Sequence, residues 1–311
     1  MKKILITGGA GYIGSMLSTK LVELGHTVTV IDLMKYDKNS LSHLFYYNNF
    51  HLIKHDVCDE KYIKKIIKKF DIIIPLAALV GAPLCEKNKN KTLKTNVDTI
   101  KILLKYIKKS QKIIYPTTNS GYGVGLKNKH CDENSPLNPI SLYGITKLRA
   151  EKLVMTHKNS IAFRLATVFG VSYRMRTDLL VNNFVEKAIK TNLLEIFEPH
   201  FRRNYIHIRD VVSAIIYAIE NFSKLKGNIY NLGLSSANLT KINLAKKIKK
   251  HYPKLKIKII KNQTDPDKRD YYVSNKKIER NGFKAKISLD IGINELIKLF
   301  NNVEVKFINN Y

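Results

Sequence analysis

The chain has 311 residues, of which 44% are hydrophobic, and it carries a formal net charge of +29. This length allows one large or two modest hydrophobic cores, and no apolar run reaches the length of a membrane span. The lysines are spread along nearly every segment without a nucleic-acid-binding signature, so we expect neither nucleic acid nor a membrane as partner. A general lysine, asparagine and isoleucine bias explains the charge, whose field would still attract polyanionic ligands such as nucleoside diphosphates.

The three cysteines, Cys58, Cys85 and Cys131, follow neither a disulfide nor a metal-binding pattern. The N-terminus enters a predicted strand at once, which leaves no room for a signal peptide. These features predict a cytoplasmic protein without disulfides and without a metal site.

The N-terminal segment has the order strand, glycine turn, helix, strand and acid. In chain order these are a strand over 2–7, Gly8, Gly11 and Gly14, a helix over 12–24, a strand over 28–31, and Asp32. Glycines permit a tight turn and let a pyrophosphate approach the backbone at the start of the helix. The Asp32 carboxylate can accept hydrogen bonds from ribose hydroxyls and repels a 2′-phosphate, so the unit predicts NAD rather than NADP.

Strands and helices continue to alternate up to about residue 170. The predicted strands are 50–54, 71–75, 112–115 and 161–165, and the predicted helices are 60–69, 88–109 and 141–157. This order predicts an α/β fold of Rossmann type, a doubly wound and mostly parallel sheet that binds ligands at the carboxyl ends of its strands. The later pattern is less regular, with helices over 179–191, 211–222, 240–251 and 290–300 and strand-like pieces at 195–197 and 257–260.

Tyr143 and Lys147 form a Tyr-x-x-x-Lys motif. The same spacing recurs at 252–256 and 272–276, but only Tyr143 opens a predicted helix and has a hydroxyl residue, Thr118, after the preceding strand. One helical turn places Lys147 on the face of Tyr143, where its ammonium would lower the phenol pKa. Tyr143 would then remove a hydroxyl proton while Thr118 binds the reacting oxygen.

The glycine segment 7–14 and the Tyr143 motif resemble the extended short-chain dehydrogenase/reductase family, of NAD-dependent epimerase/dehydratase type. The resemblance implies an NAD-binding Rossmann domain over 1–170, with the catalytic Thr118, Tyr143 and Lys147, and a substrate-binding lobe over 171–311 from which some segments cross back. It implies that these residues bind NAD: Gly8, Gly11, Tyr12, Ile13, Gly14, Asp32, Asp56, Val57, Leu76, Ala77, Ala78, Asn96, Tyr143 and Lys147.

The residues after Thr118 restrict the chemistry. The 4,6-dehydratases of this family carry an Asp-Glu pair there, and the 3,5-epimerase/reductase branch carries a cysteine base, whereas this chain has Asn119 and Ser120. Cys85 is the one cysteine that we expect near the cleft. The sequence therefore favours redox chemistry at one carbon, either 4-epimerisation or net oxidation or reduction.

Substrate anchors are predicted in several later segments. Segment 202–210 matches an Arg-x-Tyr-Ile-His-Val-x-Asp pattern of the family, and 265–270 resembles its later arginine segment. Guanidinium groups bind phosphate oxygens in pairs, although each arginine could instead form a structural ion pair. The predicted substrate-binding residues are Asn119, Ser120, Asn183, Arg174, Arg203 and Arg269, with Arg176 as a further candidate.

Segments 74–85, 118–123 and 233–240 are similar to one branch of the family, the GDP-D-glycero-α-D-manno-heptose 4-dehydrogenases of capsular heptose biosynthesis. This implies oxidation of the sugar C4 hydroxyl with tightly held NAD. Such an enzyme must either release NADH or pass its hydride to a second acceptor, and our hypothesis for that acceptor is a 2-oxo acid such as 2-oxoglutarate. The alternatives are a nucleotide-sugar 4-epimerase and a non-catalytic NAD(H)-binding regulatory protein. The helices near 94–109 and 143–157 resemble a homodimer interface of relatives, or they merely cover the sheet.

Overall fold

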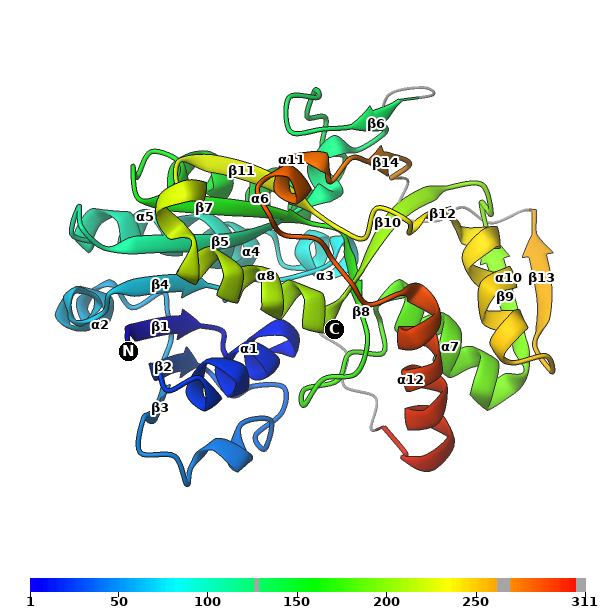
Figure 1. The fold of residues 1–311 in the computed structure, drawn as a ribbon, viewed down its shortest axis with the longest axis horizontal. Coiled ribbons are helices and arrows are strands. Elements are labelled where there is room, and N and C mark those ends of the chain that lie inside the picture. The colour runs from blue at the N-terminus through cyan, green and yellow to red at the C-terminus, as the bar shows by residue number, and fades with distance from the viewer. Residues whose placement is uncertain (126–128, 262–268, 306–311) are drawn as a thin grey trace.

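A seven-stranded parallel sheet forms the centre of the protein. The computed structural model describes residues 1–125, 129–261 and 269–305. The sheet contains β1 (Lys3–Thr7), β2 (Thr27–Asp32), β3 (Phe50–Lys54), β4 (Ile72–Pro75), β5 (Lys112–Thr118), β7 (Ser160–Leu165) and β11 (Asn228–Leu232). Their order is β3-β2-β1-β4-β5-β7-β11, and every pair is parallel (Figure 1). The predicted doubly wound α/β fold is confirmed.

Helices cover both faces of this sheet, which explains why its strands read as continuous apolar runs. In β1, Ile4 and Ile6 pack in the core beneath α1 (Tyr12–Glu23) and α8 (Ile208–Glu220). Leu5 points to the opposite face, where α2 (Glu60–Ile66), α5 (Thr99–Tyr106) and α6 (Leu142–Val154) pack. This alternation fixes the register of each strand between two dry layers.

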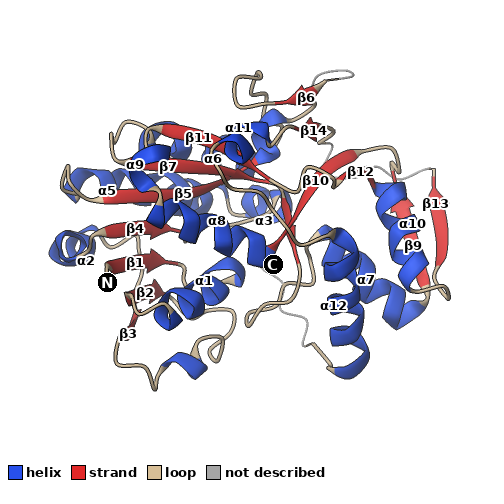
Figure 2. Ribbon diagram, viewed as in Figure 1, coloured by secondary structure: helices blue, strands red, loops and turns tan. Residues whose placement is uncertain are grey.

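The second lobe lies beside the carboxyl ends of the central strands (Figure 2). Its helices are α7 (Leu180–Thr191), α10 (Lys241–His251) and α12 (Leu289–Asn302). Its strands are β9 (Leu193–Phe197) paired with β13 (Lys256–Ile260), and the sheet of β12 (Asn238–Thr240), β10 (Arg202–His207) and β8 (Thr167–Phe169). A two-stranded pair of β6 (His130–Cys131) and β14 (Tyr272–Val273) completes the strands. The division into two domains at residue 170 stays a prediction. Two elements that come after residue 170 belong to the first domain in space, because β11 is a strand of the central sheet and α8 packs against α1.

The predicted helix 88–109 is interrupted. It consists of α4 (Lys89–Leu93), a π-helical segment η3 (Lys94–Asp98) and α5. A short helix α3 (Ala82–Lys87) precedes it, and α9 (Phe222–Leu225) and α11 (Lys276–Arg280) are further short helices that the sequence analysis did not predict. The remaining short turns are the 3₁₀ segments η1 (Ser42–Leu44), η2 (Ile67–Lys69) and η4 (Asn119–Tyr122).

Candidate active site

A cavity of about 630 Å³ opens at the carboxyl ends of the central strands, between the two lobes. Most of the predicted site residues line it together. These are Gly8, Gly11, Tyr12, Ile13, Gly14, Asp32, Asp56, Val57, Leu76, Ala77, Ala78, Thr118, Ser120, Tyr143, Lys147, Arg174, Asn183, Arg203 and Arg269. Asn96 and Asn119 are predicted site residues that do not line it.

The glycine turn forms one wall. Gly8 has φ +72°, and a Cβ there would lie 2.6 Å from the Ala77 nitrogen. A Cβ on Gly14 would lie 2.6 Å from the Gly8 oxygen, so both positions need the absence of a side chain. No side chain caps the start of α1 at Gly11. The first turn of α1 therefore presents its amides and its positive dipole end to the cavity, which fits a pyrophosphate.

Asp32 ends β2 at the same wall. Its carboxylate accepts hydrogen bonds from the Met34 nitrogen (2.9 Å) and the Ala10 nitrogen (3.1 Å). Burial raises the pKa of Asp32, and these amides together with the charge of Arg174 partly oppose the rise. The carboxylate is thus oriented by backbone on the cavity surface, as a contact with ribose hydroxyls requires.

Asn96 holds the loop after β4, which lines the cavity, through hydrogen bonds. Its Oδ1 accepts a hydrogen bond from the Leu79 nitrogen (2.8 Å), and its Nδ2 donates to the Leu79 oxygen (3.0 Å). Nδ2 also contacts the Thr146 hydroxyl at 3.2 Å. Asn96 therefore ties the loop that lines the cavity to α6, which carries Tyr143, and its predicted contact with the cofactor gains no support from this position.

The three predicted catalytic residues all line the cavity. The Thr118 hydroxyl lies 2.8 Å from that of Ser120, and Arg269 donates a hydrogen bond to the Ser120 oxygen. Burial raises the pKa of Tyr143; the charges of Arg269 and Arg176 and the Thr118 hydroxyl act in the opposite direction. Tyr143 lies in the first turn of α6, where Ser141 caps the helix by accepting from the Gly144 nitrogen.

Lys147 is buried one helical turn further along α6. Its Nζ donates to the Pro116 oxygen at 2.8 Å and lies 4.2 Å from the centre of the Tyr115 ring. Burial lowers the pKa of Lys147 to about 7, against the attraction of Glu151. The sequence analysis expected the Lys147 ammonium to lower the Tyr143 pKa, but the chief opposing charges in this structure are those of two arginines.

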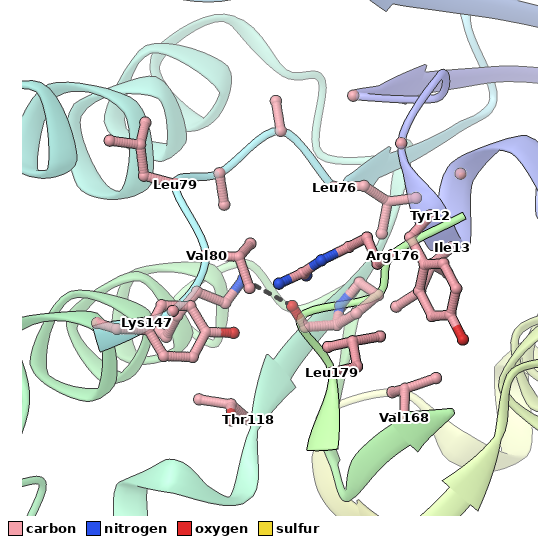
Figure 3. A pocket seen from close by; sticks show the side chains of 18 of the residues that line it. Tyr12, Ile13, Leu76, Leu79, Val80, Thr118, Lys147, Val168, Arg176 and Leu179 are labelled. Atoms are coloured by element: carbon pink, nitrogen blue, oxygen red, sulfur yellow. Dashed lines mark hydrogen bonds between the residues drawn. The ribbon is translucent and has the colours of Figure 1, made fainter. Parts of the chain in front are cut away.

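Arg176 is one of these two arginines. Figure 3 shows its side chain passing between Leu76 and Leu179 and reaching toward the side of the cavity that carries Val80 and Lys147. It forms a bidentate ion pair with Asp178. The guanidinium is therefore held in a fixed orientation.

The substrate lobe contributes further cations. Arg203, on β10, is buried, lines the cavity and donates to the Arg202 oxygen at 2.9 Å. Arg202 itself is engaged by Asp270 at 2.8 Å and does not line the cavity. Lys241, the first residue of α10, is buried and lines the cavity. Sequence reasoning missed Lys241 because a single lysine carries no signal in so lysine-rich a chain.

Two predicted groups lie behind the cavity wall. Asn119 is buried, and neither its Nδ2 nor its Oδ1 has a hydrogen-bond partner among the described residues. The Cys85 thiol is buried and donates to the Leu79 oxygen at 3.4 Å, and burial raises its pKa to about 11. Cys85 belongs to a small apolar cluster against which Tyr143 packs, but it is a poor base at neutral pH.

The profile of the "NAD dependent epimerase/dehydratase family" matches residues 4–233. The chain belongs to this family. UDP-glucuronic acid decarboxylase 1 of Arabidopsis thaliana is 30% identical over 96% of this chain and 70% of its own length. A dTDP-D-glucose 4,6-dehydratase of Dictyostelium discoideum is 30% identical over 80% of this chain and 62% of its own.

Solved structures agree with this assignment. UDP-glucose 4-epimerase of Thermotoga maritima has a TM-score of 0.84 and 26% identity, over 96% of this chain and 98% of that one. UDP-glucuronic acid 4-epimerase of Bacillus cereus, solved with UDP-glucuronic acid and NAD, has a TM-score of 0.86 and 23% identity, over 96% of this chain and 99% of that one. This family member is thus an NAD-dependent enzyme that modifies nucleotide sugars. NAD accepts a hydride from a carbinol carbon, and the glycine turn and Asp32 fit its pyrophosphate and ribose.

Within the described ranges, no helix has the length and apolar character to span a bilayer. The same residues contain no group of three or more His, Cys, Asp or Glu side chains arranged to hold a metal ion.

Proposed function

We propose that this enzyme oxidises the C4 hydroxyl of a nucleotide-activated sugar, GDP-D-glycero-α-D-manno-heptose in particular, to the 4-keto sugar. Tyr143 takes the hydroxyl proton, and Thr118 forms a hydrogen bond to the reacting oxygen. Lys147 favours the ionised form of Tyr143 and binds the ribose of the cofactor. The carbon gives up its hydride to NAD, so the C–H and O–H bonds break and the carbonyl forms.

The observation that carries this proposal is that, among the described residues that line the cavity, no free carboxylate lies beside the catalytic residues. Among described residues that line the cavity, the acids are Asp32, Asp37, Asp56 and Asp178. Asp32 ends β2, and Asp37 and Asp56 follow β2 and β3, at the end of the cavity that suits adenosine; Asp178 is paired with Arg176. A dehydratase needs an acid and a base to remove a C5 proton and expel a C6 hydroxyl, so this site favours redox chemistry alone.

The reactions named among the relatives support C4 as the site of oxidation. A ketone at C4 acidifies the C5 proton for elimination, lies β to a C6 carboxylate for decarboxylation, and permits return of the hydride from the other face for epimerisation. An enzyme that stops at the ketone uses the first step common to all three. The choice of GDP-heptose comes from the likeness of segments 74–85, 118–123 and 233–240 to heptose 4-dehydrogenases.

Arg203, Arg269 and Lys241 are our candidates for the diphosphate of the substrate, and Asn183 on α7 lines the same cavity. A 4-dehydrogenase that keeps its cofactor must also discharge two electrons. We propose that a 2-oxo acid such as 2-oxoglutarate takes them up and leaves as the 2-hydroxy acid. The arginines that bind a diphosphate also suit its carboxylates.

A nucleotide-sugar 4-epimerase is the second candidate, because the Thermotoga maritima 4-epimerase is 26% identical over nearly the whole chain. The experiment incubates purified protein with GDP-heptose, with and without 2-oxoglutarate, and analyses the sugar by mass spectrometry and NMR. A product lighter by two hydrogen atoms, with matching 2-hydroxyglutarate, supports the proposal. An unchanged mass with an inverted C4 centre indicates an epimerase. Turnover that survives in Tyr143→Phe would reject the proposed site.

We also propose a cytoplasmic homodimer in which α5 and α6 pair with their counterparts. The two helices pack side by side on one face of the sheet. The three cysteines, all within the described residues, form no disulfide. Sedimentation equilibrium of the purified protein tests the dimer, and a monomer at micromolar concentration would reject it.

A further inference from the structure

The segment that carries Arg269 connects the two lobes of the protein. Arg269 lines the cavity and donates a hydrogen bond to the Ser120 oxygen in the turn η4, which directly follows Thr118. The next residue, Asp270, is not among the described residues that line the cavity. The strand β14 then pairs with β6 and packs against β10 (Figure 1). The position of the Arg269 guanidinium therefore depends on how this segment is held.

Asp270 contacts both lobes at once. Its carboxylate accepts three hydrogen bonds from Arg202 on β10: from the backbone nitrogen (2.7 Å), from Nε (2.8 Å) and from Nη2 (3.0 Å). Its backbone is bonded to the chain just after η4. The Asp270 nitrogen donates to the Gly123 oxygen (3.1 Å), and the Gly125 nitrogen donates to the Asp270 oxygen (2.8 Å). A single residue thus ties the turn beside the catalytic threonine to a strand of the substrate lobe.

The ion pair between Arg202 and Asp270 is partly shielded from water, with 22% and 20% of the two side chains exposed. The Arg202 guanidinium also lies 5.0 Å from the centre of the Tyr272 ring. Burial acts to raise the pKa of Asp270, but the hydrogen bonds and the charge of Arg202 outweigh it and hold the pKa below its ordinary value. Both partners are therefore charged at neutral pH, and a bidentate pair fixes the orientation of the two groups as well as their distance.

Arg202 also orients the second arginine of the cavity. Its backbone oxygen accepts hydrogen bonds from Arg203 Nη1 (2.9 Å) and from the Tyr271 nitrogen (3.3 Å). The Arg203 guanidinium lies 5.9 Å from the centre of the Tyr271 ring. Arg203 and Arg269 are thus the chain neighbours of Arg202 and Asp270, and each is held in place next to the ion pair.

We propose that the Arg202–Asp270 ion pair is a positioning pair that sets Arg203 and Arg269 at the spacing that a nucleoside diphosphate requires. It does so in a fixed relation to the turn beside Thr118. Neither member of the pair binds the substrate itself, since each acts through the arginine next to it. The inference rests on the proposed function only in taking Arg203 and Arg269 as phosphate ligands.

The test measures the affinity of the NAD-loaded protein for GDP, and for UDP in parallel, by isothermal titration calorimetry. Asp270→Asn removes a negative charge next to Arg269, so charge alone predicts tighter binding of an anion. Loss of positioning predicts the opposite, a weakening by about tenfold. Arg202→Gln should weaken binding by a similar factor. Arg202→Lys keeps the charge without the bidentate geometry and should weaken binding less.

Two further variants separate positioning from a general loss of structure. The double variant Arg202→Gln/Asp270→Asn should bind no more weakly than the weaker of the two single variants, because both changes remove the same pair. Arg209→Gln is the matched control and should bind like the wild type. It breaks the ion pair of Arg209 on α8 with Glu295 on α12, and Arg209 is not among the described residues that line the cavity.

Tighter nucleotide binding by Asp270→Asn would overturn the proposal, and so would affinities in all variants equal to that of Arg209→Gln. A wild-type protein that binds neither GDP nor UDP would also overturn it, because Arg203 and Arg269 would then not be phosphate ligands. Arg202→Lys keeps the test valid if Asp270→Asn does not fold. The measurement needs neither a sugar nor turnover, so failure to oxidise GDP-heptose would leave its result unaffected.

Discussion

Replacement of Lys147 by methionine should make the cofactor-free protein more stable while abolishing turnover. Burial lowers the pKa of Lys147 from its ordinary value of 10.5 to about 7. Between these values the unfolded chain holds a proton that the folded chain has released, so the stability contributed by this residue rises with pH across the window. The buried amine thus costs stability at neutral pH, and a neutral side chain of similar length avoids that cost.

The two pKa values give the size of the effect. The cost of burying Lys147 is about 4 kcal/mol at pH 7 and falls to about 1 kcal/mol at pH 9.5. Methionine also gives up the hydrogen bond from Nζ to the Pro116 oxygen, which is worth about 1 kcal/mol. Lys147→Met should therefore be more stable than the wild type by about 3 kcal/mol at pH 7, with almost no difference at pH 9.5.

Urea unfolding of cofactor-stripped protein at the two pH values measures this difference. Lys152→Met is the control, because Lys152 is an exposed lysine on the same helix and should change stability by less than about 0.5 kcal/mol at both pH values. A Lys147→Met protein no more stable than the wild type at pH 7, or a gain that stays constant up to pH 9.5, would refute the reasoning.

Three further predictions concern the cavity wall and the substrate lobe. Gly14→Ala should lose co-purifying NAD and about 1–3 kcal/mol of stability, because its Cβ would lie 2.6 Å from the Gly8 oxygen; thermal unfolding and cofactor content check this. Arg203→Gln should raise KM for the nucleotide sugar by about tenfold or more with kcat less affected, as steady-state kinetics would reveal; an unchanged KM would remove Arg203 from the diphosphate site. Cys85→Ser should keep kcat within about twofold, and a thiol reagent should leave Cys85 unmodified in the folded protein at pH 8, since burial raises its pKa to about 11.

The sequence predicted those parts of the fold that local chemistry specifies. Gly14 is required by a close backbone approach to Gly8 and Gly9 within a single βαβ unit, and Asp32 is the last residue of its strand. Gly8 is marked in the sequence by its place in the same glycine turn, although the backbone that approaches it belongs to Leu76 and Ala77. Tyr143 lies in the first turn of a helix whose cap, Ser141, is two residues earlier in the chain. Such features depend on neighbours in sequence, so a single sequence displays them.

Features that depend on distant contacts were missed. β11 contains Asn228 and Asn231, which break its apolar run; the Asn231 amide is satisfied by Tyr122 and by the Cys131 and Ser274 oxygens. The π-helical segment interrupts a predicted continuous helix where Asn96 bonds to Leu79, a contact outside any local pattern.

The electrostatics of the site depend on tertiary structure in the same way. The Tyr143 motif predicts an adjacent ammonium, whereas the fold buries Lys147 against the Pro116 oxygen and brings Arg176 and Arg269 from distant segments toward the phenol. Arg174 shows the same limit: the sequence pattern suggested a substrate ligand, and its place beside Tyr36 and Asp32 emerges only from the packing of two loops.

The central claim is that the protein removes hydride from C4 of a nucleotide sugar and passes it to a second substrate. The most direct measurement supplies GDP-heptose carrying deuterium at C4 together with 2-oxoglutarate, and locates the deuterium by mass spectrometry. Our account predicts a 4-keto sugar without deuterium and 2-hydroxyglutarate that carries it. Deuterium retained at C4 of a recovered sugar whose configuration is inverted would contradict the account and assign the protein as an epimerase.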